Sequence, residues 1–396
     1  MGRDTPHQLI MVNGEAGSGK TVLMSNLFYD LFRESNKEQG ESVFSGISTY
    51  LLVNHEQQLT VYKEIAKKLG IKEQYVQKPT SFINNHSSEN PVDVVIVDEA
   101  ARVNPLDLMI PLSQATKKII LVGDHRQLPH VYNEDIFDEL QNDGEIDENL
   151  REKGIRQSMF EYLKEKADEL EKKDNIKRTI TLDRQYRMHK LLGNFINQNF
   201  YEVYNEGFHS PLEDEIFKQD FYKTPLVWID VKNTVDKEIK KGTSRKRESE
   251  ANIIVNKLKE MITSGKGEKL TYGVISFYKA QVDEITEKLK KEGLSNKVKV
   301  GSVDAFQGME FDVMFLSVVR TNTKESLNSS FPYGFLASEN RLCVALSRQK
   351  RLLVVVGDSD IFHSNEWKEL ARKNVPAMVN LYELCLKEGE VIDGSK

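Results

Sequence analysis

Seven short segments rich in valine, isoleucine and leucine recur along the chain and predict β-strands. Their apolar residues follow one another without alternation, which is typical of strands buried on both faces of a parallel sheet. The segments lie at residues 9–12, 92–97, 118–122, 226–231, 272–277, 312–319 and 352–356.

Segments with helical spacing of apolar residues lie between the predicted strands. They predict amphipathic helices at residues 21–32, 249–262 and 280–291, and residues 48–70 predict a strand, a loop and another amphipathic helix. The Lys/Glu-rich residues 164–177 predict a solvent-facing helix, and the basic, glycine-containing residues 237–247 predict a loop. Because strands and helices alternate, we expect an α/β fold with two parallel-sheet domains, divided near residue 180.

Composition narrows the class of protein. The 396 residues suffice for two domains, and no apolar run approaches the ~18 residues that span a bilayer. The first residues lack the apolar region of a signal peptide, so we expect neither a membrane protein nor a secreted one. Two cysteines, Cys343 and Cys385, are too few for a disulfide scaffold or a four-cysteine zinc site, and we expect a cytoplasmic protein. With 61 acidic and 55 basic residues the net charge is −6, so any nucleic-acid contact would need a local basic groove.

The segment GEAGSGKT follows the first predicted strand and precedes a predicted helix, which is the context of a phosphate-binding loop. Its glycines let backbone N–H groups point at phosphate oxygens, and the helix N-terminus adds partial positive charge. We expect Lys20 to reach the β- and γ-phosphates and the Thr21 hydroxyl to bind Mg²⁺. The predicted nucleotide-binding residues are Gly14, Glu15, Ala16, Gly17, Ser18, Gly19, Lys20 and Thr21.

Two further strands end in polar residues. VDVVIVDEA, at residues 92–100, brings Asp98 and Glu99 to the carboxyl end of a strand, where ligands of α/β sheets bind. We expect Asp98 to bind Mg²⁺ and Glu99 to act as the base that orients the attacking water, which together predict hydrolysis of ATP with Mg²⁺. LVGDHRQLPH, at residues 121–130, places Gln127 where it could sense the γ-phosphate.

This last string resembles the third motif of superfamily 1 helicases, GDxxQLPP, with His130 at the second proline. The similarity continues over nearly the whole chain and narrows to the up-frameshift-like 5′→3′ branch, superfamily 1B. It is carried by SMFEYL and LDRQYRMHKLLGNFINQNFYE, and by the strings at residues 272–285, 300–321 and 339–358. Lys190 and Phe277 stand where that branch usually has proline. The N-terminal half also looks like a bacterial P-loop helicase-like group.

The resemblance implies two tandem RecA-like P-loop domains, at residues 1–180 and 181–396, with parallel central sheets. It implies an ATP-dependent helicase or translocase on single-stranded DNA or RNA, moving 5′→3′. Tyr186 matches the tyrosine that stacks on the nucleotide base, and Glu310 matches the acid that contacts the ribose. Arg187 and Arg348 match two arginines that reach the γ-phosphate from the second domain, where they would act as arginine fingers beside Lys20 and Asp98.

The nucleic-acid track is predicted from weaker signals. Residues 48–70 resemble motif Ia, and residues 79–82 lie where motif Ib would be. Side chains there could bond phosphates without reading bases; the alternative is that asparagine and threonine after a strand are simple turn formers. An aromatic-plus-basic pair could do similar work in the second domain. The predicted contacts are Asn54, His55, Thr80, Ser81, Tyr278 and Lys279.

Departures from the branch leave alternatives open. The spacing between motifs has no room for the large inserted domains of the messenger-decay enzyme, so a preference for RNA does not follow. Gln8 is too close to the first strand to match the family's adenine-reading glutamine, which implies relaxed base recognition or an N-terminal segment that is missing or separately supplied. Two rival functions remain. One is an ATPase switch that remodels or times a protein partner without unwinding, and the other is a helicase core detached from a larger polypeptide.

Overall fold

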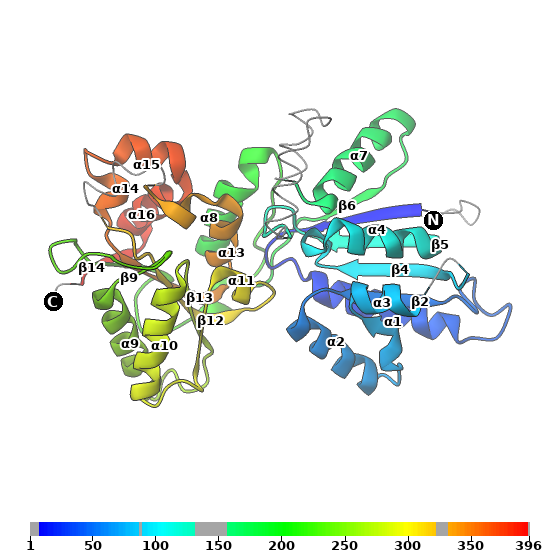
Figure 1. The fold of residues 1–396 in the computed structure, drawn as a ribbon, viewed down its shortest axis with the longest axis horizontal. Coiled ribbons are helices and arrows are strands. Elements are labelled where there is room, and N and C mark those ends of the chain that lie inside the picture. The colour runs from blue at the N-terminus through cyan, green and yellow to red at the C-terminus, as the bar shows by residue number, and fades with distance from the viewer. Residues whose placement is uncertain (1–7, 87–88, 131–156, 322–331, 395–396) are drawn as a thin grey trace. The chain divides into compact units, whose positions relative to one another are not determined.

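A computed structural model describes residues 8–86, 89–130, 157–321 and 332–394 of the chain. The chain divides into two compact units, Met1–Asp183 (unit 1) and Arg184–Lys396 (unit 2), each built around its own sheet (Figure 1). Both sheets have six strands, and every pair of neighbouring strands in them is parallel. The fold is therefore α/β with two parallel central sheets, as the sequence predicts.

Unit 1 arranges its strands in the order β3-β2-β4-β5-β1-β6. Its strands are β1 (Gln8–Gly14), β2 (Thr49–Val53), β3 (Val76–Gln77), β4 (Val92–Asp98), β5 (Ala115–Gly123) and β6 (Thr179–Leu182). Its helices are α1 (Lys20–Ser35), α2 (Glu56–Lys68), α3 (Pro79–Asn85), α4 (Pro105–Gln114) and α7 (Met159–Asp174), with short 3₁₀ turns η1 (Glu73–Tyr75) and η2 (Ala100–Arg102).

Both faces of the sheet in unit 1 are buried, because side chains alternate between the two faces of a strand. In β4, Val94 and Ile96 pack into the core that α1 and α2 cover. Val95 and Val97 pack into the opposite core, together with Phe82 of α3 and residues of α4 and α7. Asp98 continues the first of these rows, so its side chain points toward α1 and α2.

Unit 2 arranges its strands in the order β11-β10-β12-β13-β7-β14 and adds the two-stranded sheet β8-β9. The strands are β7 (Leu226–Asp230), β8 (Ile239–Lys241), β9 (Ser244–Lys246), β10 (Tyr272–Ser276), β11 (Val298–Gly301), β12 (Phe311–Ser317), β13 (Gln349–Gly357) and β14 (Glu390–Asp393). The helices are α8 (Lys190–Phe200), α9 (Glu248–Thr263), α10 (Lys279–Lys291), α11 (Val303–Phe306), α13 (Glu339–Ala345), α14 (Asp360–His363), α15 (Lys368–Asn374) and α16 (Pro376–Glu388), with 3₁₀ turns η3 (Glu202–Tyr204), η4 (Asp214–Phe217) and η5 (Gly334–Ala337).

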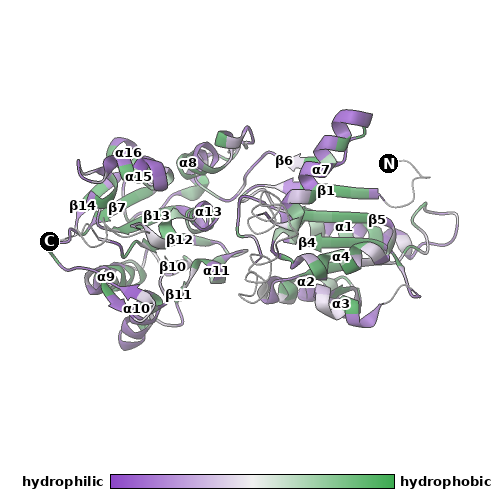
Figure 2. Ribbon diagram, turned by 45° about the horizontal axis from the view of Figure 1, so that its top comes forward, coloured by the Kyte–Doolittle hydropathy of each residue, from purple (hydrophilic) through white to green (hydrophobic). Residues whose placement is uncertain are grey.

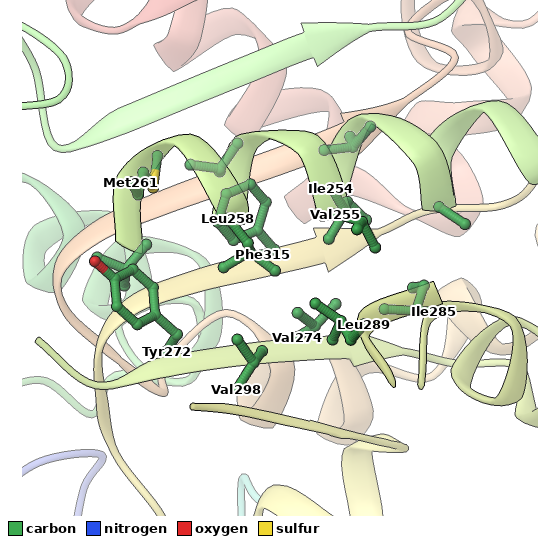
Figure 3. Close-up of a cluster of buried hydrophobic side chains, with 14 of the residues drawn as sticks. Ile254, Val255, Leu258, Met261, Tyr272, Val274, Ile285, Leu289, Val298 and Phe315 are labelled. Carbon is green, nitrogen blue, oxygen red and sulfur yellow. The ribbon is translucent and has the colours of Figure 1, made fainter. Parts of the chain in front are cut away.

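The core of unit 2 also fills both faces of its sheet. Figure 3 shows residues of α9 over β10 and β12, where Leu258 lies beside Phe315. On the opposite face, Trp228 of β7 packs edge-on against Tyr382 of α16 and donates its indole N–H to the carbonyl of Gly357. The central strands of both sheets are largely hydrophobic and the outer helix α7 largely hydrophilic (Figure 2), which is the pattern that a sheet buried on both faces requires.

All seven predicted strands and all the predicted helices are confirmed. The predicted loop at residues 237–247 is wrong, because β8 and β9 form an antiparallel hairpin there. Its two-residue turn begins with Gly242 at a φ of 62°, a left-handed conformation that favours glycine. The strands are only three residues long and mostly charged, so neither hydrophobic run nor alternation revealed them. Within the described residues, no helix combines the length and the apolarity needed to span a bilayer.

Candidate nucleotide-binding site

The loop between β1 and α1 has the backbone of a phosphate cradle. Gly17 and Gly19 adopt left-handed conformations, with φ values of 80° and 79°, which other residues rarely adopt. Ser18 N–H donates to the Glu15 carbonyl at 3.1 Å and tightens the turn. Helix α1 begins at Lys20, so its N-terminal N–H groups face the loop.

Lys20 folds back over this loop. Its Nζ donates to the carbonyls of Gly14 at 2.6 Å and Glu15 at 3.3 Å. A Cβ on Gly14 would lie 2.4 Å from Lys20 Cγ, so only glycine leaves room for the lysine stem there. The Ser18 hydroxyl oxygen is buried and has no hydrogen-bond partner among the described residues, which suits a loop built to hold an oxygen-rich ligand.

Asp98 ends β4 as a fully buried carboxylate held by two donors. Its Oδ2 accepts from the Tyr62 hydroxyl at 2.6 Å, and its Oδ1 accepts from Glu99 N–H at 2.9 Å. Tyr62 comes from α2 and lies 3.4 Å, Oη to O, from the Thr21 carbonyl of α1. One hydroxyl therefore links α2 to both predicted Mg²⁺ residues.

The environment of Asp98 resists ionisation. Burial raises the pKa of Asp98 to about 6, and the negative charge of Glu99 adds to the rise. The hydrogen bonds from Tyr62 and from Glu99 N–H, and the charge of Lys20, act in the opposite direction. A divalent cation beside this carboxylate would favour the ionised form, so the site suits Mg²⁺ electrostatically.

Glu99 adopts a left-handed backbone, with φ 52° and ψ 39°, which is uncommon for a residue other than glycine and typical of functional turns. Its side chain lines a cavity of about 230 Å³ together with Asn54, His55, Arg102, Pro129 and His130. Glu99, the predicted catalytic base, thus lines the same cavity as Asn54 and His55, two residues predicted to contact nucleic acid. Burial, and then the charge of Arg102, lower the pKa of His55, whose buried Nδ1 has no hydrogen-bond partner among the described residues.

Gln127 lies in a compact loop after β5. Its Nε2 donates to Asp124 Oδ2 at 2.6 Å, and Arg126 N–H donates to the other oxygen of Asp124 at 3.0 Å. The neighbouring His125 contacts Asn13 Oδ1 at 3.1 Å, directly before the phosphate-binding loop. The Gln127 amide is buried within its own loop, so sensing a phosphate would require it to leave Asp124.

In unit 2, three of the residues assigned by resemblance gather before β12 and β13. Arg187 Nε donates to Glu310 Oε2 at 3.1 Å, and its Nη1 donates to the Ser347 carbonyl at 2.9 Å, next to Arg348. Lys350 Nζ lies 2.6 Å from Glu310 Oε1. Burial opposes ionisation of Glu310, but Arg187 and Lys350 outweigh it and lower its pKa.

Tyr186 and Arg348 differ in accessibility. Tyr186 is 51% exposed, so its ring is available for stacking. Arg348 is 1% exposed, and its guanidinium donates to the Val344 carbonyl at 3.1 Å and to Ser347 Oγ at 2.7 Å. In this conformation Arg348 is engaged with the end of the preceding helix, α13, and with Ser347, so contact with a phosphate would require a rearrangement.

The predicted nucleic-acid residues fall into unlike environments. Asn54 is exposed, with its amide donating to the Arg102 carbonyl, and Thr80 and Ser81 are exposed on the first turn of α3. The structure does not fit the predicted contact of Tyr278 with nucleic acid. Its ring is 4% exposed and packs 5.7 Å, between centroids, from Phe335, so it has no face to offer a base here. Lys279 is exposed but pairs with Asp283 at 2.6 Å.

No group of three or more His, Cys, Asp or Glu side chains that could hold a metal ion occurs in the described parts of the chain. A Mg²⁺ ion bound with a nucleotide needs fewer protein ligands, because water and phosphate oxygens supply the rest. Thr21 and Asp98 are the side chains that would hold it here.

Comparison with known proteins gives the class. Residues 155–360 match the family described as AAA domain, and residues 7–202 match the Schlafen group 3, DNA/RNA helicase domain. The chain belongs to the AAA-domain family and to the superfamily 1B helicases of the up-frameshift-like branch.

Individual relatives are named as helicases or as regulators of nonsense transcripts. The chain is 31% identical over 291 residues to the regulator of nonsense transcripts 1 homolog of Neurospora crassa, covering 70% of this chain and 23% of that protein. It is 29% identical over 307 residues to the DNA polymerase alpha-associated DNA helicase A of Schizosaccharomyces pombe, covering 72% and 41%. A solved arterivirus helicase, nonstructural protein 10, aligns over 91% of this chain and 62% of its own at 17% identity, with a TM-score of 0.44. The chain thus spans less than half the length of the two curated relatives from Neurospora crassa and Schizosaccharomyces pombe.

Sequence reasoning missed Tyr62 and Lys350. Tyr62 lies in an amphipathic helix where an aromatic residue is usually core, and only the register of α2 against β4 brings its hydroxyl to Asp98. A signal for Tyr62 exists in the strand pattern, since Asp98 shares the face of Ile96 and must find a polar partner there. Lys350 is two residues from Arg348, and its partner Glu310 is 40 residues away in the sequence.

We predict that Tyr62 positions Asp98 for Mg²⁺. In Tyr62→Phe, Asp98 loses a donor that favours its charged form, so its pKa rises further. The Mg²⁺ concentration for half-maximal ATPase activity should increase by about 10–100-fold. The acidic limb of the pH–rate profile should move to higher pH. Tyr50→Phe is the matched control, because Tyr50 makes ring contacts with Tyr75, Phe82 and His86 in the same unit. An unshifted acidic limb in Tyr62→Phe would show that the hydroxyl serves folding alone.

Asp98 itself should make stability depend on pH. Its pKa is about 3.9 in an unfolded chain and about 6 in the folded one, so folding favours the protonated form. The stability that the protonated carboxyl contributes is complete below about pH 4 and is lost as the pH rises through about 6. Asp98→Asn should therefore have a higher melting temperature than the wild type at pH 7.5 without Mg²⁺ and nucleotide. Each kcal/mol gained in the free energy of unfolding should raise the melting temperature by about 2–4 °C. This gain in melting temperature should disappear at pH 4. Equal gains at both pH values would contradict the prediction.

Proposed function

We propose that the chain is an ATP-dependent helicase or translocase that acts on single-stranded DNA or RNA and moves 5′→3′. The observation that carries this proposal is the convergence, within unit 1, of the phosphate-binding loop, the buried Asp98 and the strained Glu99 at the carboxyl edge of one parallel sheet. Phosphoryl transfer needs little more than such positioning and charge stabilisation. The direction and the single-stranded substrate rest on the resemblance to the 5′→3′ branch.

The chemistry divides among named side chains. Lys20 neutralises charge on the β- and γ-phosphates, and Glu99 orients the attacking water. Mg²⁺, held by Thr21 and Asp98, would supply further neutralisation of phosphate charge. We propose that Tyr186 stacks on the base, that Glu310 contacts the ribose, and that Gln127, Arg187 and Arg348 respond to the γ-phosphate.

Stimulation by nucleic acid follows from the cavity beside Glu99. Asn54 and His55, at the start of α2, line the same space as the proposed base, so a strand held there would alter the surroundings of Glu99. The relatives named as helicases, one of them a DNA helicase, support a nucleic-acid substrate. Contacts of this kind go to the backbone, and we expect no sequence specificity.

A second candidate is an ATPase switch that is stimulated by nucleic acid and remodels or times a partner complex without unwinding. It is favoured by compactness, since the described residues form only two α/β units without an added domain that could act as a wedge. The chain also spans 23–41% of the curated relatives cited above, so partners or further domains of a longer protein could supply the unwinding function.

We predict that single-stranded DNA or RNA raises the ATPase rate and that two variants remove it for different reasons. Lys20→Ala loses the phosphate clamp, so turnover should fall by at least about 100-fold. Glu99→Gln should lose turnover to a similar extent but keep nucleotide binding, measured with a fluorescent ATP analogue. Lys67→Ala, which changes an exposed lysine of α2, is the matched control and should behave like the wild type. Normal turnover in Lys20→Ala would overturn the proposed site.

Strand displacement separates the two candidates. A duplex with a 5′ single-stranded tail should be opened in the presence of ATP and Mg²⁺, and a duplex with a 3′ tail should not. Stimulated hydrolysis without displacement of either duplex would favour the switch.

A further inference from the structure

The β8-β9 hairpin concentrates positive charge on a chain that is acidic overall. Residues 237–247 contain six basic residues and one acidic residue, a local net charge of +5, against −6 for the whole chain. The hairpin pairs Lys240 with Arg245 directly across its two strands. Like charges directly opposite each other weaken a hairpin, so this pair does not serve the pairing of the two strands.

The two lysines before the turn are available for a ligand. Lys240 and Lys241 are exposed, and the side chain of neither makes a hydrogen bond or an ion pair within the described residues. Three of the other basic residues are engaged, whereas Lys237 is exposed and precedes both strands. Arg245 pairs with Glu238 at 2.8 Å, Lys246 with Glu284 at 2.6 Å, and Arg247 with Asp236 at 2.8 Å.

Glu238 fixes the first strand to the body of unit 2. Its carboxylate is 5% exposed and accepts from Arg245 Nη1 and, at 2.8 Å, from Thr321 N–H. The guanidinium of Arg320, 3% exposed, lies 3.4 Å from the same carboxylate. Glu238 therefore joins the hairpin to the segment that follows β12.

Arg247 fixes the second strand. It is fully buried, and its Nη2 donates to the carbonyls of Lys232 and Asp236 at 2.8 and 3.1 Å. Its backbone N–H and carbonyl are both bonded to the Gln281 amide, at 2.8 and 3.0 Å. Charges are expensive to bury unless their geometry is well satisfied, so this anchor defines the position of the hairpin closely.

The described residues that follow β12 are also held by hydrogen bonds. Val319 has a φ of 69°, which is strained for a β-branched residue, and its N–H donates to both oxygens of Glu250, at 3.1 and 3.0 Å. Glu250 also accepts from Ser317 Oγ at 2.7 Å and lies beside Arg247. The hairpin, α9 and the end of β12 thus form one ionic framework.

This framework stands at the carboxyl edge of the sheet in unit 2. Thr321 follows β12, and Ser244 of the hairpin accepts from the N–H of Ala280, which follows β10 (Figure 1). Arg187, Glu310 and Arg348 gather instead where β12 and β13 begin. A ligand on the hairpin would therefore be separate from the nucleotide residues of this unit.

We propose that the β8-β9 hairpin binds the phosphodiester backbone of single-stranded nucleic acid, with Lys240 and Lys241 contacting phosphates. The proposal rests on the nucleic-acid binding of the proposed function and assigns a surface to it. Lys240 and Lys241 are consecutive in β8, so their side chains point to opposite faces of the hairpin, where each can contact a phosphate of a flexible polymer with one charge per nucleotide. An acidic whole chain needs such a local attraction. It replaces Tyr278, whose ring is buried, as a strand contact of unit 2.

The test is a salt titration of binding. Fluorescence anisotropy with labelled oligo(dT) and oligo(U), from 50 to 300 mM salt without nucleotide, gives the affinity and its slope. Lys240→Gln combined with Lys241→Gln should weaken binding on the order of tenfold at 0.1 M salt. The magnitude of the log–log slope should fall by about 1.4, since each phosphate contact on a single strand contributes about 0.7. ATPase activity without nucleic acid should stay unchanged.

Lys266→Gln combined with Lys269→Gln is the matched control. It makes the same change in charge on exposed lysines of unit 2, before β10 and so at the opposite edge of the sheet. Binding by the control should equal that of the wild type. Equal losses in both double variants, or wild-type binding in the hairpin variant, would overturn the hairpin proposal and leave the proposed function standing. Absence of binding by the wild-type chain would instead overturn the proposed function.

Glu238→Gln tests whether binding depends on the fixed position of the hairpin or only on its positive charge. It makes the chain more positive, so simple attraction predicts tighter binding. Loss of the anchor to Arg245 and Arg320 predicts weaker binding, by a factor of about three or more, with the chain still folded by thermal melting. Tighter binding in this variant would show that the position of the hairpin does not matter and would contradict the proposal.

Discussion

The site in unit 1 depends on one buried hydrogen bond, from the Tyr62 hydroxyl to the Asp98 carboxylate. A carboxylate taken out of water is costly unless donors surround it, and Asp98 has two, at 2.6 and 2.9 Å. The donor from α2 also reaches the Thr21 carbonyl. The Tyr62 hydroxyl thereby connects α1, α2 and the end of β4 at the buried carboxylate.

Much of the fold follows from simple patterns in the sequence. The central strands of both sheets are continuous apolar runs, because helices cover both faces, and such runs are hard to mistake. The phosphate-binding loop is equally predictable from the sequence, since Gly17 and Gly19 adopt conformations that few other residues adopt. These features are local, and local sequence is sufficient to predict them.

Other features depend on contacts between distant segments and were not predictable. The burial of Tyr278 against Phe335, the engagement of Arg348 with the preceding helix and the pairing of Glu310 with Lys350 all require the folded unit. The β8-β9 hairpin was hidden for a different reason. Its short strands are held by partly buried ion pairs with Asp236 and Glu238 rather than by apolar alternation, which makes them resemble a polar loop in sequence.

If Lys20 binds the β- and γ-phosphates as proposed, its position over its own loop has a consequence for product release. Its ammonium bonds to the carbonyls of Gly14 and Glu15, so any incoming phosphate competes with two internal acceptors. A triphosphate offers oxygens on two phosphates to win that competition, whereas a diphosphate offers only one. The lysine can therefore return to its carbonyls once the terminal phosphate has left, and the loop itself would favour exchange of the spent nucleotide for a fresh one.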